Sequence, residues 1–160
     1  MKIRKTQEKD IKNVVDLYQK ARDFMRKSGN PNQWQDGYPS EESLRDDMKK
    51  GVSYVIEDEG SIVGTFAFII GEDTFYSHIE NGAWRKDEPY GVIHRIASSG
   101  QVRNFTKICL DFCLEQIPYL RIDTHEDNIP MKRAIKRYGF KECGLVYVRD
   151  KSPRRAFDYY

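Results

Sequence analysis

The spacing of hydrophobic residues near the start of the chain predicts a short strand followed by two helices. Ile3 alternates with polar neighbours, as in a half-buried strand. Apolar side chains then recur every three or four residues from position 11 to position 25, which is the period of one helix face, and Thr6 is the expected N-cap. Ser40 is the expected N-cap of a shorter helix that ends before Gly51.

The rest of the chain alternates between strand-like and helix-like patterns. The pattern predicts strands at 52–57, 62–70, 90–99, 119–124 and 140–148, helices at 101–117 and 129–138, and a further candidate strand at 155–160. A tight turn between the first two of these strands implies an antiparallel hairpin, whereas a strand, a crossover helix and a strand imply a parallel pair. We therefore expect an α/β fold with a mixed, mostly antiparallel central sheet of six or seven strands and helices on both faces.

Composition and charge add limits on size and partners. The chain has 160 residues, of which 39% are hydrophobic, and a formal charge of +2. A chain of this length buries enough surface to fold alone, so we expect one domain over residues 1–160. The small net charge and a pI of about 8.3 argue against a nucleic-acid partner. No apolar run approaches the roughly 20 residues of a membrane helix, so no membrane partner is expected.

The N-terminus and the cysteines indicate a compartment. The first residues contain no apolar segment of a secretory signal, and three cysteines form an odd set in a chain that needs no disulfide. We therefore expect a cytoplasmic protein. Cys109 and Cys113 could share a helix face and bind zinc, but no second pair follows at zinc-finger spacing. Buried thiols are the favoured interpretation, and we expect no metal.

Several motifs along the chain resemble the GNAT superfamily of acetyl-CoA-dependent N-acetyltransferases. They are the order of the elements, the segment 94–98 (His-Arg-Ile-Ala-Ser) that runs into a helix, and Asn128 followed by Tyr-Gly-Phe at 138–140. The segment 34–40, with its Trp, Gly, Tyr and Pro, and Gly-x-Trp at 82–84 are similar to a little-characterised bacterial subgroup. The resemblance covers nearly the whole chain.

The resemblance implies a site for acetyl-CoA as co-substrate. The sheet would splay between the strands at 90–99 and 119–124, with the pantetheine arm in the gap. The pyrophosphate would bind at the start of the next helix, where backbone amides lack partners. Asn104 and Thr106 stand where the family has small residues, so the Thr hydroxyl and the charge of Arg103 would rebuild the phosphate site; a capping loop that binds nothing is the alternative. The cofactor-binding candidates are Ile96, Ala97, Ser98, Gln101, Val102, Arg103, Asn104, Phe105, Thr106 and Asn128.

Three of these candidates have more specific predicted roles. Asn128 would hydrogen-bond the pantetheine or the helix backbone, and an N-cap role alone explains it equally well. The backbone amides of Ile96 or Ala97 would be the oxyanion donors that the family implies, if the strand bulges there.

Acetyl transfer to an amine also needs groups that move protons. His94 would share a strand face with Ile96, and an imidazole suits a general base; a core histidine is the alternative. Asp123 and His125 end the facing strand and could hold the amine, relay its proton or orient one another, or they could belong to a surface loop. The tyrosine that acts as an acid in the family is absent from its usual position. Tyr138, about one turn on, is the substitute, with a packed aromatic as the alternative.

Two irregular segments carry aromatic residues and one acid that suit a cationic amine. The acceptor-binding candidates are Trp34, Tyr38, Tyr76, Glu80 and Trp84. The main hypothesis is an N-acetyltransferase that moves an acetyl group to a primary amine of a small molecule or peptide by direct attack within a ternary complex. The alternative is a non-catalytic ligand-binding module of the same fold with a degenerate cofactor loop. Either protein could form a homodimer.

Overall fold

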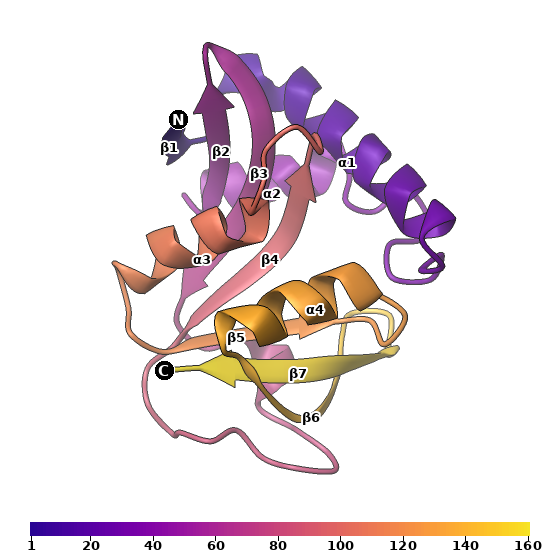
Figure 1. Cartoon of the computed structure of the whole chain (residues 1–160), viewed down its shortest axis with the longest axis vertical. Helices are drawn as coiled ribbons and strands as arrows, with labels where there is room; N and C mark the ends of the chain where they lie inside the picture. Colours follow the sequence, from indigo (N-terminus) through magenta and orange to yellow (C-terminus); the bar gives the residue numbers. More distant parts are fainter. The chain divides into compact units, whose positions relative to one another are not determined.

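The computed structural model describes residues 1–160, which form seven strands and four α-helices (Figure 1). The strands are β1 (Lys2–Lys5), β2 (Ser53–Asp58), β3 (Ser61–Ile70), β4 (Gly91–Ser98), β5 (Leu120–Thr124), β6 (Lys141–Tyr147) and β7 (Pro153–Tyr159). The helices are α1 (Ile11–Lys27), α2 (Glu41–Lys49), α3 (Phe105–Leu114) and α4 (Ile129–Tyr138), and two short 3₁₀ helices are η1 (Glu8–Asp10) and η2 (Thr74–Tyr76). No helix is both long and apolar enough to cross a membrane.

The strands pair in the order β1-β2-β3-β4-β5-β7-β6. β1 with β2, β2 with β3, β5 with β7 and β6 with β7 are antiparallel, whereas β4 and β5 are parallel. The mixed, mostly antiparallel sheet is therefore confirmed, and it has seven strands. The last of them begins at Pro153, two residues before the predicted start, because its first residues already pair with β6.

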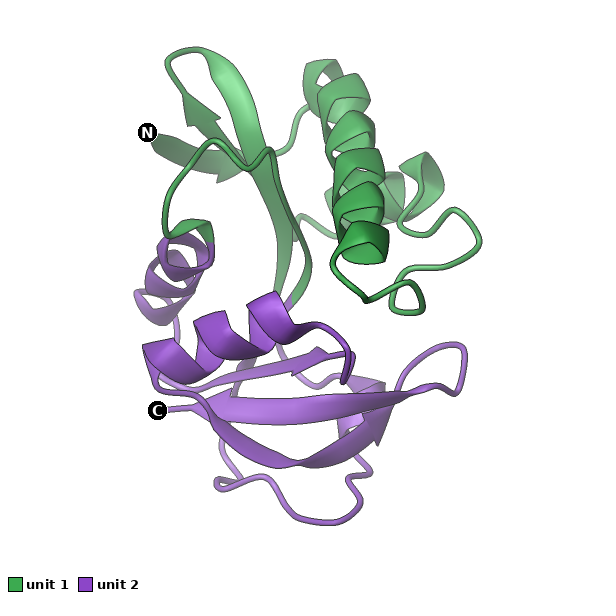
Figure 2. Ribbon diagram, turned by 45° about the vertical axis from the view of Figure 1, so that its right-hand side comes forward, with its two compact units in different colours: residues 1–68, 94–105 green, residues 69–93, 106–160 purple.

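Two compact units make up the chain (Figure 2). The first unit contains Met1–Phe68 and His94–Phe105, and the second contains Ile69–Ile93 and Thr106–Tyr160. β3 and β4 each contribute residues to both units.

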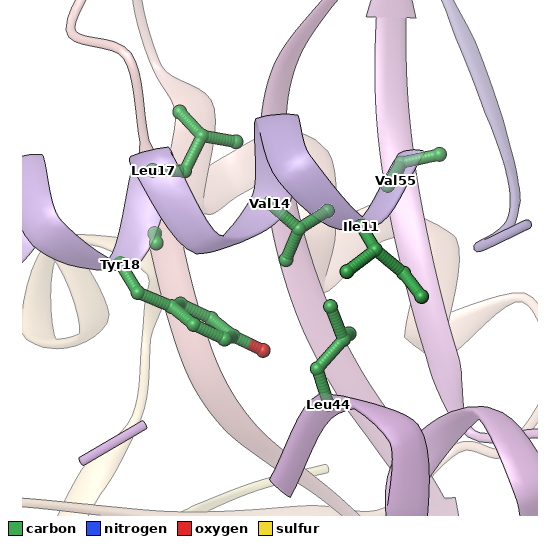
Figure 3. Packing of buried hydrophobic residues seen from close by; sticks show 7 residues of the cluster. Ile11, Val14, Leu17, Tyr18, Leu44 and Val55 are labelled. Carbon is green, nitrogen blue, oxygen red and sulfur yellow. The ribbon is translucent and has the colours of Figure 1, made fainter. Parts of the chain in front are cut away.

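The core of the first unit is built by the apolar face that the periodicity of α1 predicts. Ile11, Val14 and Tyr18 of this face are buried, and Figure 3 shows them directed toward Leu44 of α2. Val55 of β2 is part of the same cluster. Burial of each of these side chains contributes roughly 1.5–3 kcal/mol, so this interface fixes how α1 and α2 cover the strands of this unit.

The predicted N-cap of the first helix is wrong. The Thr6 hydroxyl instead pairs with the Ser53 hydroxyl at 2.7 Å, so it is not available to cap the helix. The chain first forms η1, whose N-cap is Gln7, and α1 begins only at Ile11. The carboxylate of Asp10, at the third position of η1, accepts the Gln7 N–H at 2.8 Å, which is one half of a capping box.

The second unit has a core of aromatic and small side chains. Its buried cluster consists of Tyr76, Tyr90, Val92, Tyr119, Val146 and Ala156. The predicted ends of α4 are confirmed: Asn128 Oδ1 accepts the Met131 N–H at 3.2 Å, and Gly139 ends the helix with φ of 123°. The three cysteines are buried free thiols, and burial raises the pKa of Cys143 to about 11.

The third helix is shorter than predicted at both ends. Residues 101–104 form a loop rather than a first helical turn, because Asn104 has φ of 56°, in the left-handed region that a right-handed helix excludes. At the other end, the amides of Gln116 and Ile117 both bond to the Cys113 carbonyl, so the helix closes before Pro118. The loop between β4 and α3 is therefore longer than the sequence predicts.

Candidate active site

A left-handed residue interrupts β4 at the centre of the predicted catalytic strand. Arg95 has φ of 53°, which is uncommon for a residue with a side chain and costs about 1–2 kcal/mol. Alternation of side chains assumes extended residues throughout, so the shared face of His94 and Ile96 stays a prediction. His94 and Ile96 are half-buried, whereas Ala97 is buried in the core of the first unit.

The Arg95 side chain is held by two partners far away in the sequence. Its Nε and Nη2 donate to the two carboxylate oxygens of Asp47 at 2.7 and 2.8 Å, and Nη1 donates to the Tyr38 hydroxyl at 2.9 Å. Asp47 lies on α2 and is 6% exposed. A bidentate pair of this kind fixes both position and orientation of the guanidinium. The sequence analysis missed Arg95 and Asp47 as site residues.

Two acceptor-binding candidates lie on the same side-chain network. Tyr38 packs edge to face on Trp34 with ring centroids 6.5 Å apart, and Trp34 packs in the same way on Tyr18 at 6.2 Å. The Tyr38 hydroxyl is already bonded to Arg95. Trp34 and Tyr38 are therefore brought together, and Tyr38 supports the irregular part of β4.

The loop between β4 and α3 contains two more left-handed residues, Gly100 with φ of 82° and Asn104 with φ of 56°. The hydroxyls of Ser98 and Ser99 accept the N–H groups two residues ahead, at 3.1 and 3.3 Å. Gln101 and Asn104 are exposed, as is Arg103, whereas Val102 and Thr106 are half-buried. The loop therefore presents backbone and one cation at its surface.

Phe105, the last candidate of this loop, is buried against Gly64 of β3. A Cβ atom at position 64 would lie 2.0 Å from the Phe105 ring and 3.2 Å from the Ala97 carbonyl oxygen. Phe105 itself is 7% exposed. Its role in the structure is therefore to pack the start of α3 onto the sheet.

In the second unit, three predicted residues form one hydrogen-bonded group. Tyr76 is 1% exposed and donates its hydroxyl to Asp123 Oδ2 at 2.5 Å. Trp84 Nε1 donates to the Tyr76 carbonyl at 2.9 Å, and the two rings lie 5.1 Å apart. Burial and the adjacent carboxylate raise the pKa of Tyr76 well above its ordinary value, so it is a neutral donor.

The imidazole of His125 is oriented by its own loop. Its Nδ1 accepts the Asp127 N–H at 3.0 Å, which places the ring proton on Nε2. Burial, together with the charge of Arg154, lowers the pKa of His125, so the ring is neutral at pH 7. In this arrangement Nε2 is a donor, which suits holding an acceptor group better than removing a proton.

Glu80 and Tyr138 are engaged by neighbouring side chains. Glu80 accepts the Tyr147 hydroxyl at 2.9 Å and lies 3.2 Å from His78 Nε2, on an exposed surface. Tyr138 donates to Asp111 at 2.6 Å, and burial raises its pKa. It also packs on Tyr159, with ring centroids 5.2 Å apart.

A cavity of about 780 Å³ lies in the second unit beside this group, and Tyr76 and Trp84 line it. Arg121 of β5, which the sequence analysis did not select, also lines it. The signal was present in the sequence, because Arg121 stands between Leu120 and Ile122 in an otherwise apolar part of a strand.

Comparison with known proteins gives three informative structures. An acetyltransferase of the GNAT family from Streptococcus agalactiae is 30% identical, with a TM-score of 0.89 and coverage of 99% of this chain and 94% of that one. A GNAT-family acetyltransferase from Listeria monocytogenes is 18% identical, with a TM-score of 0.72 and coverage of 98% and 92%. N-acetylglutamate synthase from Neisseria gonorrhoeae, complexed with coenzyme A and N-acetyl-glutamate, is 13% identical, with a TM-score of 0.63 and coverage of 99% and 34%. No protein-family model and no curated protein sequence matches the chain.

Proposed function

Because the chain belongs to the GNAT family of acetyltransferases, we propose that it moves an acetyl group from acetyl-CoA to a primary amine by direct attack within a ternary complex. The acyltransferase role comes from the family, whereas the acetyl donor, the amine and the ternary complex are our proposal. The acceptor is an amine of a small molecule or peptide. The observation that carries the proposal is the left-handed Arg95 inside β4.

The left-handed conformation of Arg95 supports a role for the amides that follow it. A left-handed residue breaks the regular spacing of hydrogen bonds along a strand. The N–H of Ile96 or Ala97 then donates to the acyl carbonyl oxygen, where negative charge develops during attack. Asp47 and Tyr38 hold the Arg95 side chain and so keep these donors in place. Preorganised donors stabilise the transition state more than mobile donors do, because they need no reorganisation during the reaction.

β4 and the loop after it supply the binding groups for acetyl-CoA in this proposal. β4 pairs with β5 at Gly91 and Val92 and continues to Ser98, so its later residues offer backbone groups to the pantetheine arm. The left-handed Gly100 and Asn104 let the backbone approach the pyrophosphate, and the exposed Arg103 adds a charge-assisted hydrogen bond. The coenzyme A bound to N-acetylglutamate synthase, which has the same fold, supports an acyl-CoA donor.

Proton removal is assigned to His94, directly or through a water molecule. His94 is half-buried and immediately precedes the left-handed Arg95. The proposed base therefore lies two or three residues before Ile96 and Ala97, whose amides are the proposed oxyanion donors. Asp123 is assigned to the acceptor amine, because its carboxyl group accepts one hydrogen bond from Tyr76 and has further lone pairs for an amine N–H. His125 would donate from Nε2 to the acceptor rather than act as the base.

Tyr138 is the proposed acid toward the departing thiolate. The phenol is protonated at neutral pH, as an acid must be, while burial and Asp111 raise its pKa and so make it a weaker acid than a free tyrosine. The proton is donated to Asp111 in this structure, so the hydroxyl must exchange that partner for the thiolate sulfur before it acts. A Tyr138→Phe variant with an unchanged rate would return this residue to a packing role.

Titration of acetyl-CoA by calorimetry, followed by an assay of released coenzyme A over a panel of amines, tests the function. We expect binding heat, a thermal shift and amine-dependent release of the thiol. The alternative, a binding module, is favoured by Asn104 and Thr106 at positions where the family has small residues. It predicts no amine-dependent release. Absence of both heat and thermal shift at millimolar acetyl-CoA would overturn the enzyme proposal.

A further inference from the structure

The cavity of the second unit is half open to solvent and has the volume of a small-molecule site. Its volume of about 780 Å³ lies within the range of roughly 300–1,000 Å³ that is usual for such sites. The apolar part of its wall consists of Tyr76, Ile79, Ala83, Trp84, Pro89 and Tyr90. Hydrogen bonds fix the rings, since Trp84 donates to the Tyr76 carbonyl and the Tyr90 hydroxyl accepts the Asp73 N–H at 2.9 Å. The cavity is therefore pre-formed on its aromatic side.

A buried cation without a carboxylate partner lines this cavity. Arg121 is 6% exposed, and its guanidinium carbon lies 3.9 Å from the centre of the Tyr90 ring and 4.4 Å from that of Trp84. Nη2 donates to the Lys86 carbonyl at 2.9 Å, and Nε donates to the Tyr119 hydroxyl at 3.3 Å. Nη1 is not among the buried polar atoms that lack a partner, so it is open to the cavity that Arg121 lines. A buried charge normally has an opposite charge beside it, so this arrangement points to an anion from outside the chain.

The carboxylate behind Tyr119 already has another partner. Asp158 is fully buried and accepts the Tyr119 hydroxyl at 2.8 Å. Arg85 donates to Asp158 through both its backbone N–H and its Nε, and it forms the salt bridge with this carboxylate. The negative charge of Asp158 is thus balanced by Arg85, which leaves the charge of Arg121 for a ligand.

The rim of the cavity carries mostly negative charge, opposite to that of Arg121. Four acidic residues line it, Glu72, Asp73, Asp87 and Glu88, against a single further cation, Lys86, which lies 3.7 Å from Glu88. This excess of carboxylates disfavours a polyanion such as a nucleotide. It favours a ligand with one carboxylate for the arginine and a positive group at its other end.

We propose that this cavity binds a small amino-acid-like zwitterion. The carboxylate pairs with the Arg121 guanidinium, the ammonium group faces the acidic rim, and an apolar side chain lies against the rings of Trp84 and Tyr90. Arginine stacked on aromatic rings is preorganised for a planar carboxylate. The site rests on the cavity of the second unit alone, so it stands independently of the proposed acetyl transfer.

Three compounds that share a phenyl ring but differ in their charged groups test how the cavity recognises each charge. L-phenylalanine carries both groups, 3-phenylpropionate lacks the ammonium, and 2-phenylethylamine lacks the carboxylate. The chain has two tryptophans, Trp34 and Trp84, so Trp34→Phe leaves the one in the cavity as the sole indole fluorophore. Titrations of this variant follow the fluorescence of Trp84. We expect L-phenylalanine to bind at least about tenfold more tightly than 2-phenylethylamine, since the charge-assisted bond to Arg121 is lost with the carboxylate.

Arg121→Gln in the same background tests the arginine directly, and Arg137→Gln, which removes an exposed charge from α4, is the matched control. Arg121→Gln should raise the Kd for L-phenylalanine and for 3-phenylpropionate by about tenfold or more and leave the Kd for 2-phenylethylamine unchanged. The control should change none of the three Kd values. Should Arg121→Gln fail to fold, the ranking of the three probes on the Trp34→Phe protein decides alone. Equal binding of the amine and the amino acid, or no fluorescence change with millimolar probe, would overturn the proposal.

Discussion

Asp47→Asn removes the negative charge that holds Arg95 in its left-handed conformation. Loss of one partner from a buried ion pair costs about 3–5 kcal/mol. Return of Arg95 to an extended conformation would recover about 1–2 kcal/mol. We therefore expect the free energy of unfolding to fall by about 1–4 kcal/mol. At about 2–4 °C for each kcal/mol in a chain of this size, Tm should fall by roughly 2–16 °C.

The neighbouring Asp46 offers a matched control. It lies on the same helix and is exposed, so Asp46→Asn makes the same chemical change without touching the pair. Urea unfolding and calorimetry of both variants give the comparison. A double variant, Asp47→Asn with Arg95→Gln, should recover part of the loss, because no uncompensated charge is left buried. If Asp47→Asn is no less stable than Asp46→Asn, the pair does not hold Arg95 in its left-handed conformation and the reasoning fails.

Three further predictions concern the cofactor, the base and acid stability. Arg103→Ala should raise the Kd for acetyl-CoA by about tenfold or more in calorimetry, whereas Lys20→Ala, a charge removed from the exposed side of α1, should leave it unchanged. His94→Gln should lower kcat/KM by roughly 10²–10⁴ in the assay of released coenzyme A while the affinity for acetyl-CoA stays the same; an unchanged rate would make it a packing residue. Hydrogen bonds from Arg4 hold the pKa of Asp10 below its ordinary value, so this carboxylate stabilises the fold fully above about pH 4 and loses that contribution as pH falls through its folded pKa. Asp10→Asn should therefore flatten the acid limb of unfolding free energy against pH, and a limb as steep as that of the unaltered protein would contradict the assignment.

Local signals predicted most of the fold. Ser40 caps α2 and Asn128 caps α4, because each side chain reaches an amide three residues ahead and needs no other part of the chain. Asn104 adopts a left-handed conformation that its residue type tolerates better than most others. Periodicity placed the buried face of α1 for the same reason, since the period is set by the helix itself.

The sequence-based predictions are wrong or incomplete at residues whose partners lie far away along the chain. Arg95 lies in a run that the sequence predicts as extended, and its side chain pairs with Asp47, which is 48 positions away. Thr6 has the chemistry of an N-cap, but a partner 47 positions away, Ser53, occupies its hydroxyl. The ligand cavity was missed because Arg121 acquires its significance only when the irregular 71–90 segment folds over it. The pairings of Arg95 and Thr6 leave no trace in a local pattern, whereas Arg121 shows only as a charge between Leu120 and Ile122.

The contact between Gly64 and Phe105 restricts which sequences this part of the protein can have. The two positions share one volume: a methyl group at 64 would occupy the space of the ring at 105, and a smaller side chain at 105 would leave a void. Either change alone destabilises the fold, whereas Gly64→Ala combined with Phe105→Leu exchanges volume between them. Substitutions at positions 64 and 105 should therefore be correlated among homologous proteins. A library that randomises both codons should return complementary pairs of small and large residues.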